Sequence, residues 1–86
     1  MNNKCFYNTR VWLNKNSSRN TGSIVCYDGI TEFSDGMNED SFVEIADCHN
    51  KVRIHKDLNG TNDEWLNKLR LLRDNLNNFI LFLESK

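Results

Sequence analysis

The most reactive side chains in this 86-residue chain are its cysteines and histidines, and their spacing limits what they can do. Cys5, Cys26 and Cys48 are odd in number and too widely spaced for a C-x-x-C pair, which predicts neither a disulfide framework nor a metal site. Cys48 and His49 are adjacent, but neighbouring side chains on a turn seldom point at each other as a nucleophile and its base must. We therefore expect no catalytic residue, no metal and no cofactor, and a protein that is not an enzyme.

Aromatic residues interleaved with basic ones form a second pattern that could carry a function. Strand parity places a set of large or charged side chains on one face of a sheet: Lys4, Phe6, Arg10, Trp12, Val25, Tyr27, Ile30, Glu32, Phe42, Glu44, Lys51, Arg53 and His55. Such a face would expose a larger apolar patch than most monomers do. The residues predicted to bind a partner are Phe6, Arg10, Trp12, Tyr27, Phe42, Arg53 and His55.

Three uses of this face are open at the level of the sequence. The sheet could curl into a half-barrel and bury part of the face in a second small core. The face could contact a protein partner, or its aromatic side chains could stack on the bases of single-stranded nucleic acid. The chain has 11 Lys and Arg against 12 Asp and Glu, and Glu32 and Glu44 share the face, so we expect a protein partner and keep nucleic acid as the alternative.

The elements that position these residues are predicted to be about five antiparallel strands within 4–56, in meander order. Asp28-Gly29 and Cys48-His49 each lie between strand-like runs and predict two tight hairpins. Around the second turn, Val43 should face Ile54 and Glu44 should face Arg53, with Asp47 opposite Asn50 at the turn.

The first hairpin and its neighbours have a predicted register too. Around Asp28-Gly29, Tyr27 should face Ile30 and Ile24 should face Phe33, while Val11 lies beside Ile24. The first strand should then point a separate set of side chains inward, namely Cys5, Tyr7, Val11 and Leu13. Gly36 and the polar run 38–40 are expected to form the longer connection between Phe33 and Ser41.

A long amphipathic helix is predicted over 61–85, after a linker at 57–60. Thr61 and Glu64 have the spacing of a capping box. Apolar residues recur at steps of four and three, which places them on one stripe that should pack on the sheet: Trp65, Leu69, Leu72, Leu76, Phe79 and Leu83, widened by Leu66 and Ile80. Leu71 and Phe82 lie off that stripe, on a second side, and are predicted to form the interface of a homodimer.

Length and composition predict one small α+β domain over 1–86 that acts in the cytoplasm. No segment has the length of a membrane span or the pattern of a signal peptide. The many Asn and Lys residues are typical of AT-rich coding sequences, which favours a low-GC bacterium or one of its phages as the source; a phage protein would act in the host cytoplasm. The predicted function is therefore that of a small binding or regulatory protein whose partner is another protein.

Overall fold

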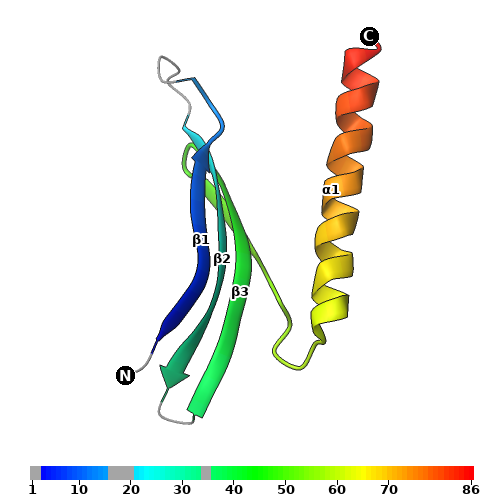
Figure 1. Cartoon of the computed structure of the whole chain (residues 1–86). Helices are drawn as coiled ribbons and strands as arrows, with labels where there is room; N and C mark the ends of the chain where they lie inside the picture. The colour runs from blue at the N-terminus through cyan, green and yellow to red at the C-terminus, as the bar shows by residue number, and fades with distance from the viewer. Residues whose placement is uncertain (1–2, 16–20, 34–35) are drawn as a thin grey trace. The chain divides into compact units, whose positions relative to one another are not determined.

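The chain forms four β-strands and one long helix in the part of it that the structure, a computed structural model, describes: residues 3–15, 21–33 and 36–86. The elements are β1 (Lys4–Trp12), β2 (Gly22–Phe33), β3 (Gly36–Asp47), β4 (Asn50–His55) and α1 (Asn62–Glu84) (Figure 1). The strands and the helix belong to two compact parts, Met1–Lys56 and Asp57–Lys86, and each part is described by itself. This α+β composition confirms the predicted fold class.

The sheet is an antiparallel meander in which each strand pairs with its neighbours in the sequence, in the order β1-β2-β3-β4. The meander was predicted, but the predicted number of five strands is wrong. Among the described residues β1 and β4 are the two edges of the sheet and do not pair with each other, so the sheet stays open.

The missing strand boundary is at Asp28-Gly29, where β2 continues instead of turning. Tyr27 pairs with Phe42 rather than with Ile30, and Gly29 pairs with Asp40. Positive φ angles occur among the described residues only at Cys48 (53°) and Gly36 (126°), so Gly29 does not have the conformation that a tight turn would demand. Position 29 has no room for a side chain, because a Cβ there would lie 2.6 Å from the Lys4 carbonyl oxygen.

Because β2 runs on to Phe33, the polar segment after it becomes part of β3. Thr31 pairs with Asn38 and Phe33 pairs with Gly36, so the predicted connection through 38–40 is a strand. Ile24 consequently pairs with Ile45 instead of facing Phe33. The pairing of a neighbouring strand thus overrides the low strand propensity of Asn, Glu and Asp.

The registers of the other two strand pairs were predicted correctly at most positions. Val43 pairs with Ile54 and Glu44 with Arg53 across the β3–β4 turn, and Val11 pairs with Ile24. Near the start of β1 the pairing shifts by one, because Cys5 pairs with Gly29 whereas Tyr7 pairs with Asp28. This β-bulge leaves Phe6 as the extra residue and reverses the alternation of faces on either side of it.

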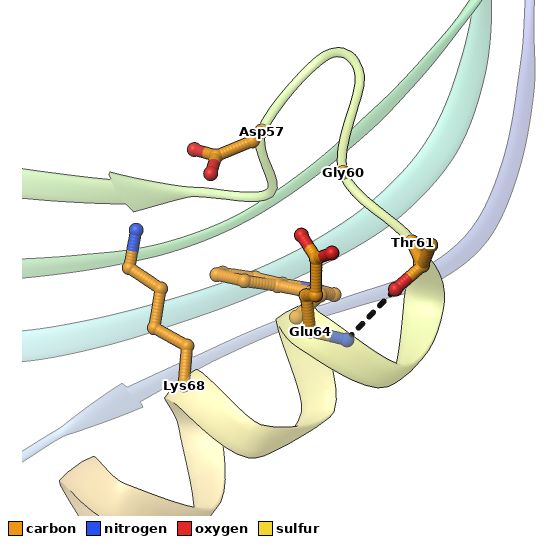
Figure 2. Close-up of a pocket in the computed structure, with 6 residues that line it drawn as sticks. Asp57, Gly60, Thr61, Glu64 and Lys68 are labelled. Atoms are coloured by element: carbon orange, nitrogen blue, oxygen red, sulfur yellow. Dashed lines mark hydrogen bonds between the residues drawn. The ribbon is translucent and has the colours of Figure 1, made fainter.

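Helix α1 begins and ends at side chains that satisfy its terminal backbone groups. The Thr61 hydroxyl accepts a hydrogen bond of 3.1 Å from the Glu64 amide, the contact that the predicted capping box requires (Figure 2). At the other end, the Ser85 amide donates to the Leu81 carbonyl at 3.2 Å and the Ser85 hydroxyl donates to the Phe82 carbonyl at 2.7 Å. The predicted helix boundaries are therefore confirmed to within a residue.

Burial varies along the apolar stripe of α1. Trp65 is buried, and three further residues of the stripe are half-buried: Leu66, Leu69 and Leu72. From Leu76 onward the stripe is exposed, with Leu76 at 51% and Phe79 at 58%. The exposed fractions thus rise along the stripe from Trp65 to Phe79, and the packing of the stripe on the sheet stays a prediction.

Candidate functional site

Cross-strand pairing arranges one face of the sheet into three rows, which together we call the aromatic face. Residues that face each other across neighbouring strands lie on the same side of a sheet. The first row is Asn8, Tyr27, Phe42 and His55; the second is Arg10, Val25, Glu44 and Arg53; the third is Trp12, Ser23, Ala46 and Lys51.

The first row is a run of rings in contact across three strands. The rings of Tyr27 and Phe42 are stacked, with centroids 5.2 Å apart and planes at 23°, and the His55 ring lies 5.9 Å from Phe42. The Arg53 guanidinium carbon lies 4.0 Å from the centroid of the Phe42 ring, a cation–π contact. These contacts hold flat side chains in place on the face, so a partner would meet an ordered surface.

Glu44 lies at the centre of the second row and is only 7% exposed. Its carboxylate is 3.2 Å from the Lys51 ammonium and 3.5 Å from the Arg53 guanidinium, which confirms the cross-strand ion pair with Arg53 that the register predicted. The Lys51 side chain is the main reason why the pKa of Glu44 lies below its usual value of 4.5, and burial acts in the opposite sense. A buried carboxylate with two cations beside it fixes both of them on the aromatic face.

The lowered pKa of Glu44 predicts a loss of stability in acid. Because the folded pKa is lower than the unfolded one, the ionised form contributes stability above pH 4.5, and this contribution is lost as the pH falls through the folded pKa. Urea denaturation at pH 7, 5 and 3 should therefore show a smaller change in midpoint for Glu44→Gln than for the wild type. The pKa of Glu39 is also lowered, by Lys56 at 2.7 Å, so Glu39→Gln is the matched comparison. An unchanged pH profile in Glu44→Gln would contradict the assignment.

Trp12, in the third row, is the most exposed aromatic side chain of the face, at 62%. The Arg10 guanidinium carbon lies 5.7 Å from its ring centroid. Both residues are on the edge strand β1, at the margin of the face. Arg10 and Trp12 therefore extend the ring cluster of the first row with a second aromatic and cationic pair.

The structure brings six of the seven predicted partner-binding residues onto this face: Arg10, Trp12, Tyr27, Phe42, Arg53 and His55. Phe6 is separated from them by the β-bulge. Lys4 and Ile30 pair with each other on the opposite face, and Glu32, two residues from Ile30 on β2, lies there too. Their predicted place on the aromatic face was wrong because it relied on a turn at Asp28-Gly29 and on unbroken alternation along β1.

The rows also contain residues that parity did not single out. Asn8, Ser23 and Ala46 complete the three rows, and Asp40 shares the face because it pairs with Gly29. Asn8 has the same parity as Arg10 and Trp12 on β1, and the register is unbroken from Tyr7 to Trp12. Their small or polar side chains separate the aromatic groups rather than adding to them.

The two residues predicted to form a dimer interface are both exposed on α1, Leu71 at 63% and Phe82 at 59%. At about 100° per residue they point in directions about 20° apart. Their separation of eleven residues spans about 16 Å of helix. The interface itself stays a prediction.

A small hollow lies at the start of α1, beside the turn that leads into the helix. Asp57, Gly60, Thr61, Glu64 and Lys68 line it together with Trp65 (Figure 2). Its volume of about 20 Å³ has room for a water molecule but not for an organic ligand. The Lys68 ammonium lies 5.9 Å from the centroid of the Trp65 ring, so the hollow belongs to the packing of the helix start.

Metal and membrane sites were also sought in the described part of the chain. No group of three or more His, Cys, Asp or Glu residues in it is arranged to hold a metal ion. Cys5 and Cys48 are exposed and Cys26 is half-buried, and the three form no disulfide. None of the helical residues described makes a span long and apolar enough to cross a membrane.

Comparisons of the chain with family models, with curated proteins and with solved structures found no match.

Proposed function

We propose that the protein is a non-enzymatic binding or regulatory protein that contacts a protein partner through the aromatic face. The observation that carries the proposal is the gathering of six predicted binding residues in three adjacent rows of one sheet face. Aromatic and arginine side chains are the types that dominate binding energy at protein interfaces. The stacked contacts among Tyr27, Phe42 and Arg53 lower the entropy cost of binding, because these side chains are already ordered.

Single-stranded nucleic acid is the alternative ligand for the same face, because exposed rings beside cations can stack on bases. The charges favour a protein. Two of the three Lys and Arg residues in the rows, Lys51 and Arg53, are ion-paired with Glu44, and Asp40 adds a second carboxylate to the face. Proteins bind a phosphate backbone through Lys and Arg side chains that neutralise its charges, and the aromatic face has few such side chains without an ion-pair partner of their own.

The proposal includes a cytoplasmic site of action, which for a phage-borne protein is the host cytoplasm, and a homodimer that contacts itself through Leu71 and Phe82. The cytoplasm and the phage origin rest on composition alone. The proposed mode of action is occlusion or bridging of the partner through the aromatic face.

Capture of partners from cells that make the protein tests the proposed surface. A protein retained by the wild type should lose at least about tenfold in affinity with Trp12→Ala and with Arg53→Ala once it is purified and titrated. Val52→Ala is the matched control, because Val52 is next to Arg53 on β4, points to the opposite face and is 56% exposed.

Nucleic acid is tested by fluorescence anisotropy with labelled single-stranded DNA and RNA. We expect no binding at micromolar protein. Salt-dependent binding that Trp12→Ala and Arg53→Ala abolish would replace the protein partner with nucleic acid. If Trp12→Ala and Arg53→Ala bound the captured protein as tightly as the control Val52→Ala does, the aromatic face would not be its binding site.

A further inference from the structure

The last turn and a half of α1, residues 79–83, is apolar on every side and exposed. Residues 75–83 carry no charge, and the five consecutive residues 79–83 are all large and apolar, so at about 100° per residue they surround the helix. Their exposed fractions run from 45% at Leu83 to 59% at Phe82. A helix that is hydrophobic all round is normally buried, so the surface of this segment requires a partner.

The sequence of this segment also has the spacing that pairs one helix with another. Leu69, Leu72, Leu76, Phe79 and Leu83 follow steps of three and four, the a and d positions of a heptad repeat. A helix pair over residues 71–84 would be about 21 Å long, and each copy would contribute four of these apolar side chains, from Leu72 onward, to its centre. The three positions from Leu76 onward are exposed in the single chain, at 51%, 58% and 45%.

We propose that the partner is a second copy of this chain, and that the two α1 helices pair antiparallel over residues 71–84. The charges beside the seam select this direction. Arg73 and Glu84 point in directions about 20° apart on one flank of the seam, and Lys68 lies on the other flank. In a parallel pair, the flank with Arg73 in one copy contacts the flank with Lys68 in the other copy. Two positive charges, Arg73 and Lys68 of the second copy, would then lie close together.

The antiparallel arrangement brings flanks of the same type together. With the overlap centred between residues 77 and 78, Arg73 lies within about one turn of Glu84 of the second copy, and the contact occurs twice by symmetry. Arg73 also contacts Asp74 of its own chain at 2.9 Å, with its side chain 70% exposed. The five N–H donors of a guanidinium allow it to bind a second carboxylate.

The flank opposite Arg73 and Glu84 carries two apolar residues, within the overlap, that fit the same register. Leu71 and Phe82 are both on it, and the antiparallel centre places Leu71 of one copy within about one turn of Phe82 of the other. The two exposed residues that lie off the main stripe thus contact each other across the pair. One register therefore uses the seam, the ionic flank and the apolar flank together.

This helix pair rests on the homodimer proposed above, to which it adds the seam and the direction of the helices, and it does not depend on the partner proposed for the aromatic face. The residues of the pair all belong to Asp57–Lys86, and those of the face to Met1–Lys56. Loss of dimerisation would leave the capture experiment unchanged as a test of the face, and the reverse also holds.

Sedimentation velocity of the full chain over a range of micromolar concentrations tests whether the pair exists. The wild type should be a dimer, and Leu76→Glu should raise the dimer dissociation constant at least about 100-fold, because each dimer would bury two unpaired carboxylates. Asn67→Glu is the control, since it adds the same charge on the helix outside the overlap. The proposal would be overturned if the wild type were a monomer both at about 100 µM and after 100-fold dilution. It would also be overturned if Leu76→Glu and Asn67→Glu had equal effects. Far-UV circular dichroism confirms that the variants keep their helix.

A charge exchange tests the direction of the helices without touching the apolar seam. Arg73→Glu and Glu84→Arg should each weaken the homodimer about tenfold, because each sets like charges side by side twice. An equimolar mixture of the two variants should recover wild-type affinity as a heterodimer. A parallel pair predicts a tighter dimer for Arg73→Glu, through Lys68, and no recovery on mixing; either result would overturn the antiparallel register. Dimers held by the sheet or by another segment would be insensitive to both substitutions and would refute the pair itself.

Discussion

Replacement of Trp65 by alanine should lower the free energy of unfolding by about 3 kcal/mol. Trp65 is the residue of α1 that the fold buries, with 7% of its surface exposed, and it lies at the first turn, directly after the cap at Thr61. Removal of a buried aromatic side chain forfeits its transfer free energy and leaves a cavity behind. Urea denaturation followed by far-UV circular dichroism measures the loss.

The matched control for this substitution is Trp12→Ala. Trp12 is the same residue type but is 62% exposed on the aromatic face, so its removal should change the free energy of unfolding by less than about 1 kcal/mol. The two variants should thus separate stability from binding: Trp65→Ala destabilises the fold, whereas Trp12→Ala weakens the partner contact. Equal losses of stability would contradict the burial of Trp65.

Replacement of Gly29 by valine should cost about 2 to 3 kcal/mol of stability. A Cβ at position 29 would lie 2.6 Å from the Lys4 carbonyl oxygen and would also meet the Tyr27 hydroxyl. Since one of these obstacles is backbone, β1 must move away from β2 before a side chain fits, and overpacking of this kind is destabilising. Thermal and urea denaturation measure the effect.

Thr31→Val is the control for Gly29→Val. Thr31 is two residues further along β2, on the same face, and valine occupies nearly the same shape as threonine there. Its effect should stay within about 0.5 kcal/mol. If Gly29→Val were tolerated as well as Thr31→Val, β1 would not pass as close to position 29 as the structure shows.

Local signals in the sequence predicted the parts of the fold whose cause is local. The capping contact between Thr61 and Glu64 marks the start of α1 to the residue. The alternation around Cys48-His49 sets the pairing of Val43 with Ile54, because a slip by one residue would move every apolar side chain to the other face. Both depend on residues close together in the sequence.

The errors came from positions where distant parts of the chain meet. Asp28-Gly29 has the composition of a turn, yet Gly29 is there because β1 passes close to it. The bulge at Phe6 is a mismatch between two strands and leaves no trace in the spacing of β1 alone. Each error moved a few residues between faces, which is why Lys4, Ile30 and Glu32 were misplaced. The face on which Tyr27 and Glu44 lie was predicted correctly, although the pairing of Tyr27 was not.

The same distinction applies to the candidate surfaces. The composition of the aromatic face could be predicted from the parity of β2, β3 and β4, whose registers are regular from Gly22 to His55. The extent of exposure along α1 could not, because periodicity reports which side of a helix is apolar but not what covers it. The exposure of Leu76 and Phe79 is the observation that supports a contact between two copies.

The most direct test of the aromatic face as a protein-binding surface is photo-crosslinking in the cells that make the protein. A photo-reactive phenylalanine analogue is placed in turn at Trp12 and at Val11, which are neighbours on β1, are exposed to similar degrees (62% and 53%) and point to opposite faces. We predict that position 12 forms a crosslink to one other protein and that position 11 does not. Crosslinks of equal yield from both positions, or a crosslink from position 12 to nucleic acid alone, would contradict the proposed function.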